Sequence, residues 1–136
     1  MKHYQIMPRN WFLVKGIPRT VTGLRRQWVF VQNSIDYPHT LKVPISDLQP
    51  LVINKALIDS SNLRCRNNEV ECIYDALRIR HETIDLPFRL KFNYDDEVPC
   101  EVIFPTGHII RFQHIHRLQQ FVNAVSGEEL RIRMRI

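Results

Sequence analysis

The sequence predicts an α+β fold in which short antiparallel strands predominate and one or two helices follow them. Of its 136 residues, 44% are apolar, which is enough to fill the core of a single domain. Eight prolines fall between short apolar runs, where turns and strand edges accept them. Apolar residues at helical spacing occur in the second half of the chain, so we expect a β-rich N-terminal part followed by a sheet combined with helices.

Apolar runs in the first 60 residues predict the N-terminal strands. The runs cover 11–14, 28–31, 40–45 and 51–58, and Gly, Pro, Asn or Asp residues lie between them. This spacing predicts a small antiparallel β-barrel or curled sheet with an SH3-like pattern. OB-like barrels and open meanders give the same pattern and remain alternatives.

The polar segment 60–68 is the one candidate boundary in the chain. It divides a basic, aromatic, β-rich subdomain, residues 1–62, from an α+β subdomain, residues 63–136. The alternative is one continuous domain, since a chain of this length fits either arrangement.

A helix is predicted after this boundary, up to His81. Asn68 can cap it, and Val70, Ile73, Tyr74 and Leu77 repeat at helical spacing. A strand is the competing interpretation, because apolar and charged residues alternate from Leu77 to Arg80.

The C-terminal third shows clearer periodicity. Three alternating runs predict strands, and these cover 88–94, 98–104 and 108–112. Residues 115–125 have helical spacing, and Gly127 follows where a glycine commonly ends a helix. Residues 130–136 alternate between apolar side chains and arginines, which predicts a terminal strand with one face made of arginine.

Positive charge is concentrated at the N-terminus. The net charge of +5 combines +7 over residues 1–68 with −2 over residues 69–136, and six Lys or Arg residues precede the first acidic residue, Asp36. Such asymmetry indicates two surfaces with different partners, although a basic chain end without a binding role is an equal alternative.

Aromatic residues lie among these N-terminal cations, a combination suited to holding phosphates and stacking on bases. If residues 9–15 form a strand, Arg9, Trp11 and Lys15 project from one face. The residues predicted to bind nucleic acid here are Arg9, Trp11, Lys15, Arg19, Arg25, Arg26 and Trp28. The alternative is that both tryptophans fill a small core, with the stems of Arg and Lys lying over it.

The C-terminal arginines form a second predicted basic element. Arg131, Arg133 and Arg135 would project together from a strand, about 6–7 Å apart, close to the phosphate spacing of a nucleic-acid strand. The same row of charge also protects an exposed strand edge from aggregation, which is the structural alternative.

Catalytic and metal-binding signatures are weak. Phosphate-cradling glycine loops and nucleophile motifs do not occur, and His114 and His116 have poor spacing for one ion on a helix. The acidic cluster at residues 95–101 allows a metal-dependent nuclease only as a remote alternative. We therefore expect a protein without enzymatic activity or cofactor.

These observations predict a small nucleic-acid-binding protein, with DNA and RNA both open. The alternative is an adaptor or inhibitor that binds an acidic protein surface through the same arginines. Three irregularly spaced cysteines, no apolar leader and no apolar stretch of about 20 residues predict a cytoplasmic protein that neither uses a disulfide framework nor enters a membrane.

Overall fold

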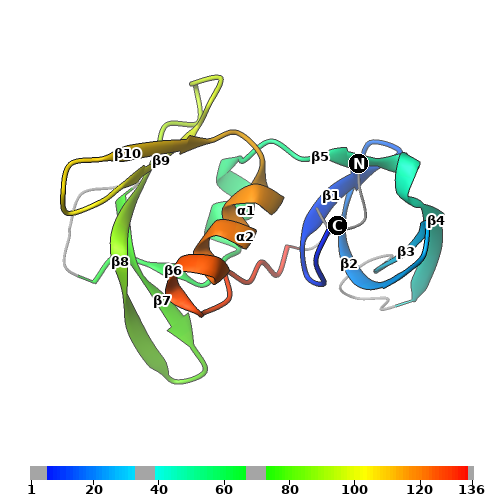
Figure 1. Ribbon diagram of the computed structural model, residues 1–136, viewed down its shortest axis with the longest axis horizontal. Coiled ribbons are helices and arrows are strands. Elements are labelled where there is room, and N and C mark those ends of the chain that lie inside the picture. Colours follow the sequence, from blue (N-terminus) through cyan, green and yellow to red (C-terminus); the bar gives the residue numbers. More distant parts are fainter. Residues whose placement is uncertain (1–5, 33–38, 67–72, 135–136) are drawn as a thin grey trace.

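The computed structural model describes residues 6–32, 39–66 and 73–134. These residues form two five-stranded antiparallel sheets, and α-helices α1 and α2 lie between the sheets (Figure 1). The predicted α+β class, with antiparallel strands in the majority, is therefore confirmed.

The N-terminal sheet has the order β4-β3-β2-β1-β5. Its strands are β1 (Trp11–Val14), β2 (Ile17–Arg25), β3 (Trp28–Gln32), β4 (Thr40–Pro44) and β5 (Leu48–Pro50). A single 3-10 turn, Ile45–Asp47, brings the chain back so that β5 pairs with β1. The result is a curled sheet (Figure 1), as the sequence predicted.

The C-terminal sheet has the order β10-β9-β8-β7-β6. Its strands are β6 (Leu63–Arg64), β7 (Ile73–Ile79), β8 (Glu82–Phe92), β9 (Cys100–Ile103) and β10 (Ile109–Phe112). The predicted strands at 88–94, 98–104 and 108–112 correspond to β8, β9 and β10. The predicted second helix is α2 (Ile115–Ser126), and Gly127 ends it in the left-handed conformation with φ 73°.

The helix predicted up to His81 is wrong over the residues described, because 73–79 form strand β7. Residues 67–72, which include the proposed cap Asn68, lie outside the described part of the chain. β7 is a central strand that pairs with both β6 and β8, and Asp75, Ala76 and Leu77 are all buried. Ladder hydrogen bonds and burial on both faces outweigh the local helical spacing.

The strand predicted at 51–58 is also wrong, because its second half forms helix α1 (Lys55–Asp59). The side-chain oxygen of Asn54 accepts a hydrogen bond from the Leu57 amide at 3.0 Å. This N-cap satisfies one free amide of the first turn and starts the helix.

The C-terminal segment alternates as predicted: Leu130 and Ile132 are buried, whereas Arg131 and Arg133 are exposed. Up to residue 134, its β-pairing is a single bridge between Ser61 and Ile132 instead of a regular strand. Arg135 lies outside the described residues.

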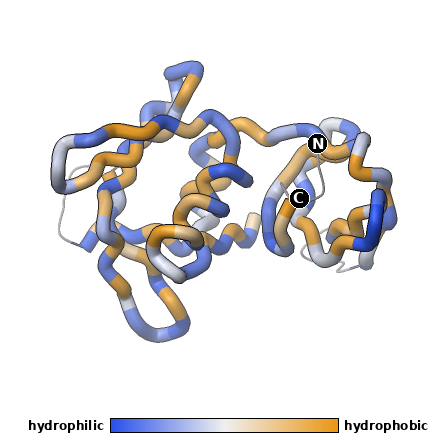
Figure 2. The backbone as a smooth tube through the Cα atoms, viewed as in Figure 1, coloured by the Kyte–Doolittle hydropathy of each residue, from blue (hydrophilic) through white to orange (hydrophobic). Residues whose placement is uncertain are grey.

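Two hydrophobic clusters form the interior, and apolar segments recur in both sheets and in α2 (Figure 2). The smaller cluster lies within the curled sheet and includes Phe12, Val29 and Val31. The larger one lies between α1, α2 and the C-terminal sheet, and it also takes in Trp11 from β1. The segment 51–58 contributes to this larger cluster, although it belongs to the predicted 1–62 subdomain.

Candidate nucleic-acid interface

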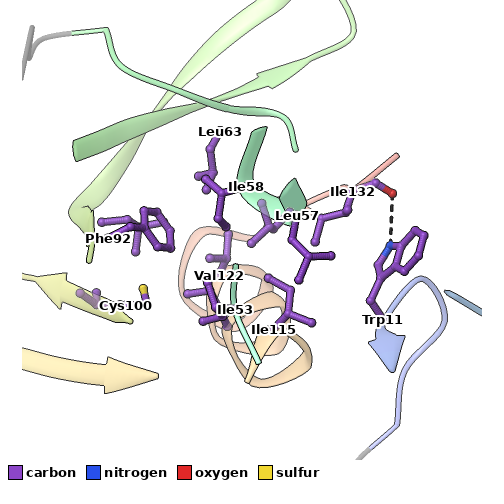
Figure 3. Packing of buried hydrophobic residues seen from close by; sticks show 14 of the residues in the cluster. Trp11, Ile53, Leu57, Ile58, Leu63, Phe92, Cys100, Ile115, Val122 and Ile132 are labelled. Atoms are coloured by element: carbon purple, nitrogen blue, oxygen red, sulfur yellow. Dashed lines mark hydrogen bonds between the residues drawn. The ribbon is translucent and has the colours of Figure 1, made fainter. Parts of the chain in front are cut away.

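Trp11 lies inside the protein. Its side chain is 3% exposed, and its indole Nε1 donates a hydrogen bond to the Ile132 carbonyl oxygen at 3.2 Å (Figure 3). Leu57 and Ile115 belong to the same cluster. The prediction that Trp11 presents its ring to a base is therefore wrong, and the core-filling alternative describes this residue.

The burial of Trp11 follows from the position of β1 between the two hydrophobic clusters. Trp11 and Leu13 pack with the larger cluster, while Phe12 and Val14 pack with the smaller one. The expected alternation is present, but the face that carries Trp11 meets the other half of the chain instead of solvent.

Arg9 is also engaged at this junction. Its guanidinium donates to the Glu129 carboxylate, and Arg131 Nε lies 3.4 Å from an oxygen of the same carboxylate. The backbone carbonyl of Arg9 accepts a hydrogen bond from the Gln119 amide at 3.0 Å. The Arg9 side chain is 61% exposed, but its charge is opposed by an acid from the C-terminal half.

Trp28 has the opposite environment, on the outer face of the curled sheet. Along β3, Val29 and Val31 point into the smaller cluster, so Trp28 and Phe30 project outward and are half-buried. Arg25 on β2 lies directly opposite Trp28, and Lys42 on β4 lies directly opposite Phe30. We call this set (Arg25, Arg26, Trp28, Phe30 and Lys42) the β3 face.

One charge of the β3 face, that of Lys42, lies close to a ring. Lys42 Nζ is 4.5 Å from the centroid of the Trp28 ring, a cation–π contact. Arg26 follows Arg25 in the turn between β2 and β3, where it adopts a left-handed φ of 55°. Within the described part of the chain, Arg25, Arg26 and Lys42 have no ion pair with a carboxylate.

The remaining predicted N-terminal cations lie elsewhere. Lys15 is exposed in the turn between β1 and β2, at the far end of β2 from Arg25. Arg19 lies opposite Phe12, so it projects toward the inner side of the sheet and is half-buried. Of the predicted residues, the structure thus brings Arg25, Arg26 and Trp28 together.

Sequence reasoning missed Phe30 and Lys42. The signal was available in the alternation of Trp28–Val31 and of Thr40–Ile45, since two aligned strands place every second residue, here the even-numbered ones, on one face. What the sequence did not supply was the register that sets Lys42 against Phe30 and near Trp28.

The groups considered for metal binding and catalysis have other environments. Among the described residues, no three His, Cys, Asp or Glu side chains gather in a way that could hold a metal ion. The rings of His114 and His116 stack with their centroids 6.1 Å apart. Asp95 and Asp96 are exposed, and Glu101 forms an ion pair with Arg111 at 3.5 Å.

The cysteines that the structure describes, Cys65 and Cys100, are free thiols, and burial raises the pKa of Cys100 well above its usual range. A thiol held in its neutral form is a poor nucleophile. Cys72 lies outside the described residues.

Comparisons of this chain with protein-family models, curated proteins and solved structures found no match. Over the described residues, no helix has both the length and the apolar character needed to cross a bilayer.

Proposed function

We propose that this protein binds nucleic acid without catalysing a reaction, using the β3 face. The observation that carries the proposal is the half-buried Trp28 ring beside cations that lack a carboxylate partner in the described part of the chain. Arg25, Arg26 and Lys42 supply charge for phosphates, and Trp28 and Phe30 supply flat faces for bases.

The energies favour stacking of a base on Trp28. An exposed cation–π contact such as that of Lys42 contributes about 0.5–1 kcal/mol. A stacked base contributes about 1–3 kcal/mol. A base can therefore displace the ammonium group from the ring, and the released Lys42 side chain becomes available to a phosphate.

We further propose that the curled sheet is of the SH3-like kind. In support, four strands follow one another as a meander, and a single 3-10 turn precedes a fifth strand that returns to β1. This concerns architecture alone, because one fold serves many functions. The functional proposal depends on the side chains of the β3 face.

Tryptophan fluorescence tests the proposal directly, because Trp11 is sealed in the core and Trp28 reaches solvent. We expect single-stranded DNA or RNA oligonucleotides to quench the emission, and Trp28→Phe to abolish the quenching. Arg25→Ala with Arg26→Ala should weaken binding and reduce the slope of log K against log salt by about 1.4, the contribution of two single-strand phosphates.

The control variant is Arg89→Ala with Arg117→Ala, which removes the same charge from exposed positions outside the β3 face. It should leave the salt slope unchanged. If the protein does not bind single- or double-stranded DNA or RNA at low salt, the proposed nucleic-acid binding is contradicted. Binding of an acidic peptide under those conditions would support the adaptor or inhibitor function instead.

A further inference from the structure

A second concentration of arginine lines a groove of about 980 Å³ on the C-terminal half. Its basic side chains come from β6, from β7 with its following turn, and from the C-terminal segment. They are Arg64, Arg78, Arg80, His81, Arg131 and Arg133. We call this site the arginine groove. The alternation at residues 131–135 predicted part of this charge, and the fold adds the charge of β6 and β7 beside it.

Asn62 holds the two sides of the groove together. Its backbone carbonyl accepts from the Arg78 amide at 2.8 Å, and its own amide donates to the Arg131 carbonyl at 3.1 Å. Its side chain accepts from the Arg131 amide at 2.9 Å and donates to the Glu129 carbonyl at 3.0 Å. Neighbouring strands lie about 4.8 Å apart, so Arg78 and Arg131, on either side of Asn62, start about 10 Å from each other.

The same backbone pairing continues along the C-terminal segment. The Arg133 amide donates to the Ser60 carbonyl at 3.0 Å, and Ile132 bridges to Ser61. Because Ile132 is buried, Arg131 and Arg133 both project away from the core. The guanidinium groups therefore extend from backbone that hydrogen bonds hold in register.

Positive charge exceeds negative charge in the groove. Among the described residues that line it, five carry guanidinium groups and three carry carboxylates, namely Asp59, Glu82 and Glu128. Asp59 is already bound by Lys55 at 2.7 Å. Within the described part of the chain, Arg78, Arg80 and Arg133 have no ion pair with a carboxylate.

The groove also lacks the rings that the β3 face presents. Among the described residues that line it, the large apolar side chains are Ile79 and Ile84, and none is Phe, Tyr or Trp. It therefore offers no aromatic surface on which a base can stack. The planar guanidinium group of arginine nevertheless matches two oxygens of a phosphate, to which it donates two parallel hydrogen bonds.

We propose that the arginine groove binds the phosphodiester backbone of nucleic acid without contacting its bases. The inference rests on the proposed function of the β3 face and extends it. Bases stack at the β3 face, while the groove adds phosphate contacts on the other half of the protein. The total salt dependence of binding then exceeds what Arg25, Arg26 and Lys42 produce alone.

The test uses the full chain and a fluorescein-labelled oligothymidylate, with anisotropy measured across a salt titration. Arg78→Gln with Arg80→Gln removes two charges from the groove and keeps polar side chains at both positions. We expect at least a tenfold weaker affinity at low salt and a slope lower by about 1.4. Quenching of Trp28 at saturation should stay at the wild-type amplitude.

Arg89→Gln with Arg117→Gln is the matched control, since it removes the same charge outside the groove, and circular dichroism checks that each variant is folded. Arg133→Gln, at an exposed position, gives an independent second measurement with an expected slope change of about 0.7. If both groove variants keep the wild-type affinity and salt slope and show normal Trp28 quenching, the proposal for the arginine groove is overturned. The proposal for the β3 face then stands. Absence of any wild-type binding or quenching would overturn both proposals.

Discussion

Trp11 and Trp28 lie on strands of the same sheet, yet only Trp28 can meet a ligand. β1 is buried on both faces because α2 packs against one of them, whereas Trp28 and Phe30 on the outer face of β3 are only half-buried. Both tryptophans have cationic residues near them in the sequence. The difference in exposure comes from what each strand packs against, and it decides which indole belongs to the candidate site.

His116 is a residue whose burial has a consequence for stability. It is 4% exposed, its ring centroid lies 4.6 Å from that of Phe12, and its Nδ1 has no hydrogen-bond partner among the described residues. Burial, and after it the nearby charges of His114 and Arg117, lower the pKa of His116 to about 4. The native state therefore holds the ring neutral between helix α2 and strand β1.

Stability should decrease as the pH falls from 6.5, the usual pKa of histidine, toward 4. In that window the unfolded state binds a proton that the native His116 does not bind, so unfolding is favoured by about 3 kcal/mol at the acidic end. Urea denaturation at pH 7.5 and pH 4.5 measures the loss. His116→Leu should show a smaller loss, while His108→Gln, at an exposed position, should behave as wild type. Equal pH dependence in all three proteins would contradict this assignment.

At the scale of elements, the amide side chain of Gln119 joins helix α2 to strand β1. Gln119 Oε1 accepts from the Trp11 amide at 3.1 Å, and its Nε2 donates to the carbonyls of Arg9 at 3.0 Å and Leu130 at 3.2 Å. Gln119 is itself buried, so these backbone groups have little access to water. One side chain thus ties the helix, the first strand and the C-terminal segment together.

Gln119→Leu should lower the free energy of unfolding by about 2–4 kcal/mol, because it leaves buried backbone groups without partners. Equilibrium denaturation in urea measures the change. Asn123→Ala, on the exposed side of the same helix, is the control and should change stability by less than about 0.5 kcal/mol. A Gln119→Leu protein as stable as wild type would show that these hydrogen bonds contribute nothing net.

Elements differed in how far the sequence predicted them, and the reason lies in the range of the interactions. Helix α2 depends on local features, namely apolar spacing and Gly127 at φ 73°, and it was predicted correctly. β7 depends on pairing with β6 and β8, and this pairing overrode helical spacing in the segment. The β3 face was predicted in part, because Lys42 reaches Trp28 only through the pairing of β3 with β4.

At the scale of the whole molecule, the two sheets share an interior. The larger cluster combines Trp11, Leu51 and Ile53 from the first part of the chain with Phe88 and Leu118 from the last part. Backbone hydrogen bonds cross the same junction, from Ile53 to Gln113 and from Ile115 to Leu51, both at 2.9 Å. We therefore expect the two parts to unfold together.

Tryptophan fluorescence and far-ultraviolet circular dichroism should report one coincident unfolding transition. Trp11→Ala should move the midpoints of both transitions to lower denaturant concentration together. It should lower the free energy of unfolding by about 3–5 kcal/mol, because it opens a cavity in the shared core. Trp28→Phe, on the open surface, is the control and should barely move either one. Two separate transitions, with only one of them sensitive to Trp11→Ala, would instead identify two independently folding parts.

The sequence by itself determined the α+β class, the C-terminal helix with its terminal glycine, and the excess of positive charge in the first half. These depend on composition and on contacts between near neighbours along the chain. The tertiary structure decided that Trp11 is buried, that Arg9 meets Glu129, and that arginines from distant segments line one groove. Exposure and the gathering of charge depend on which strands and helices pack together, and no local pattern carries that information.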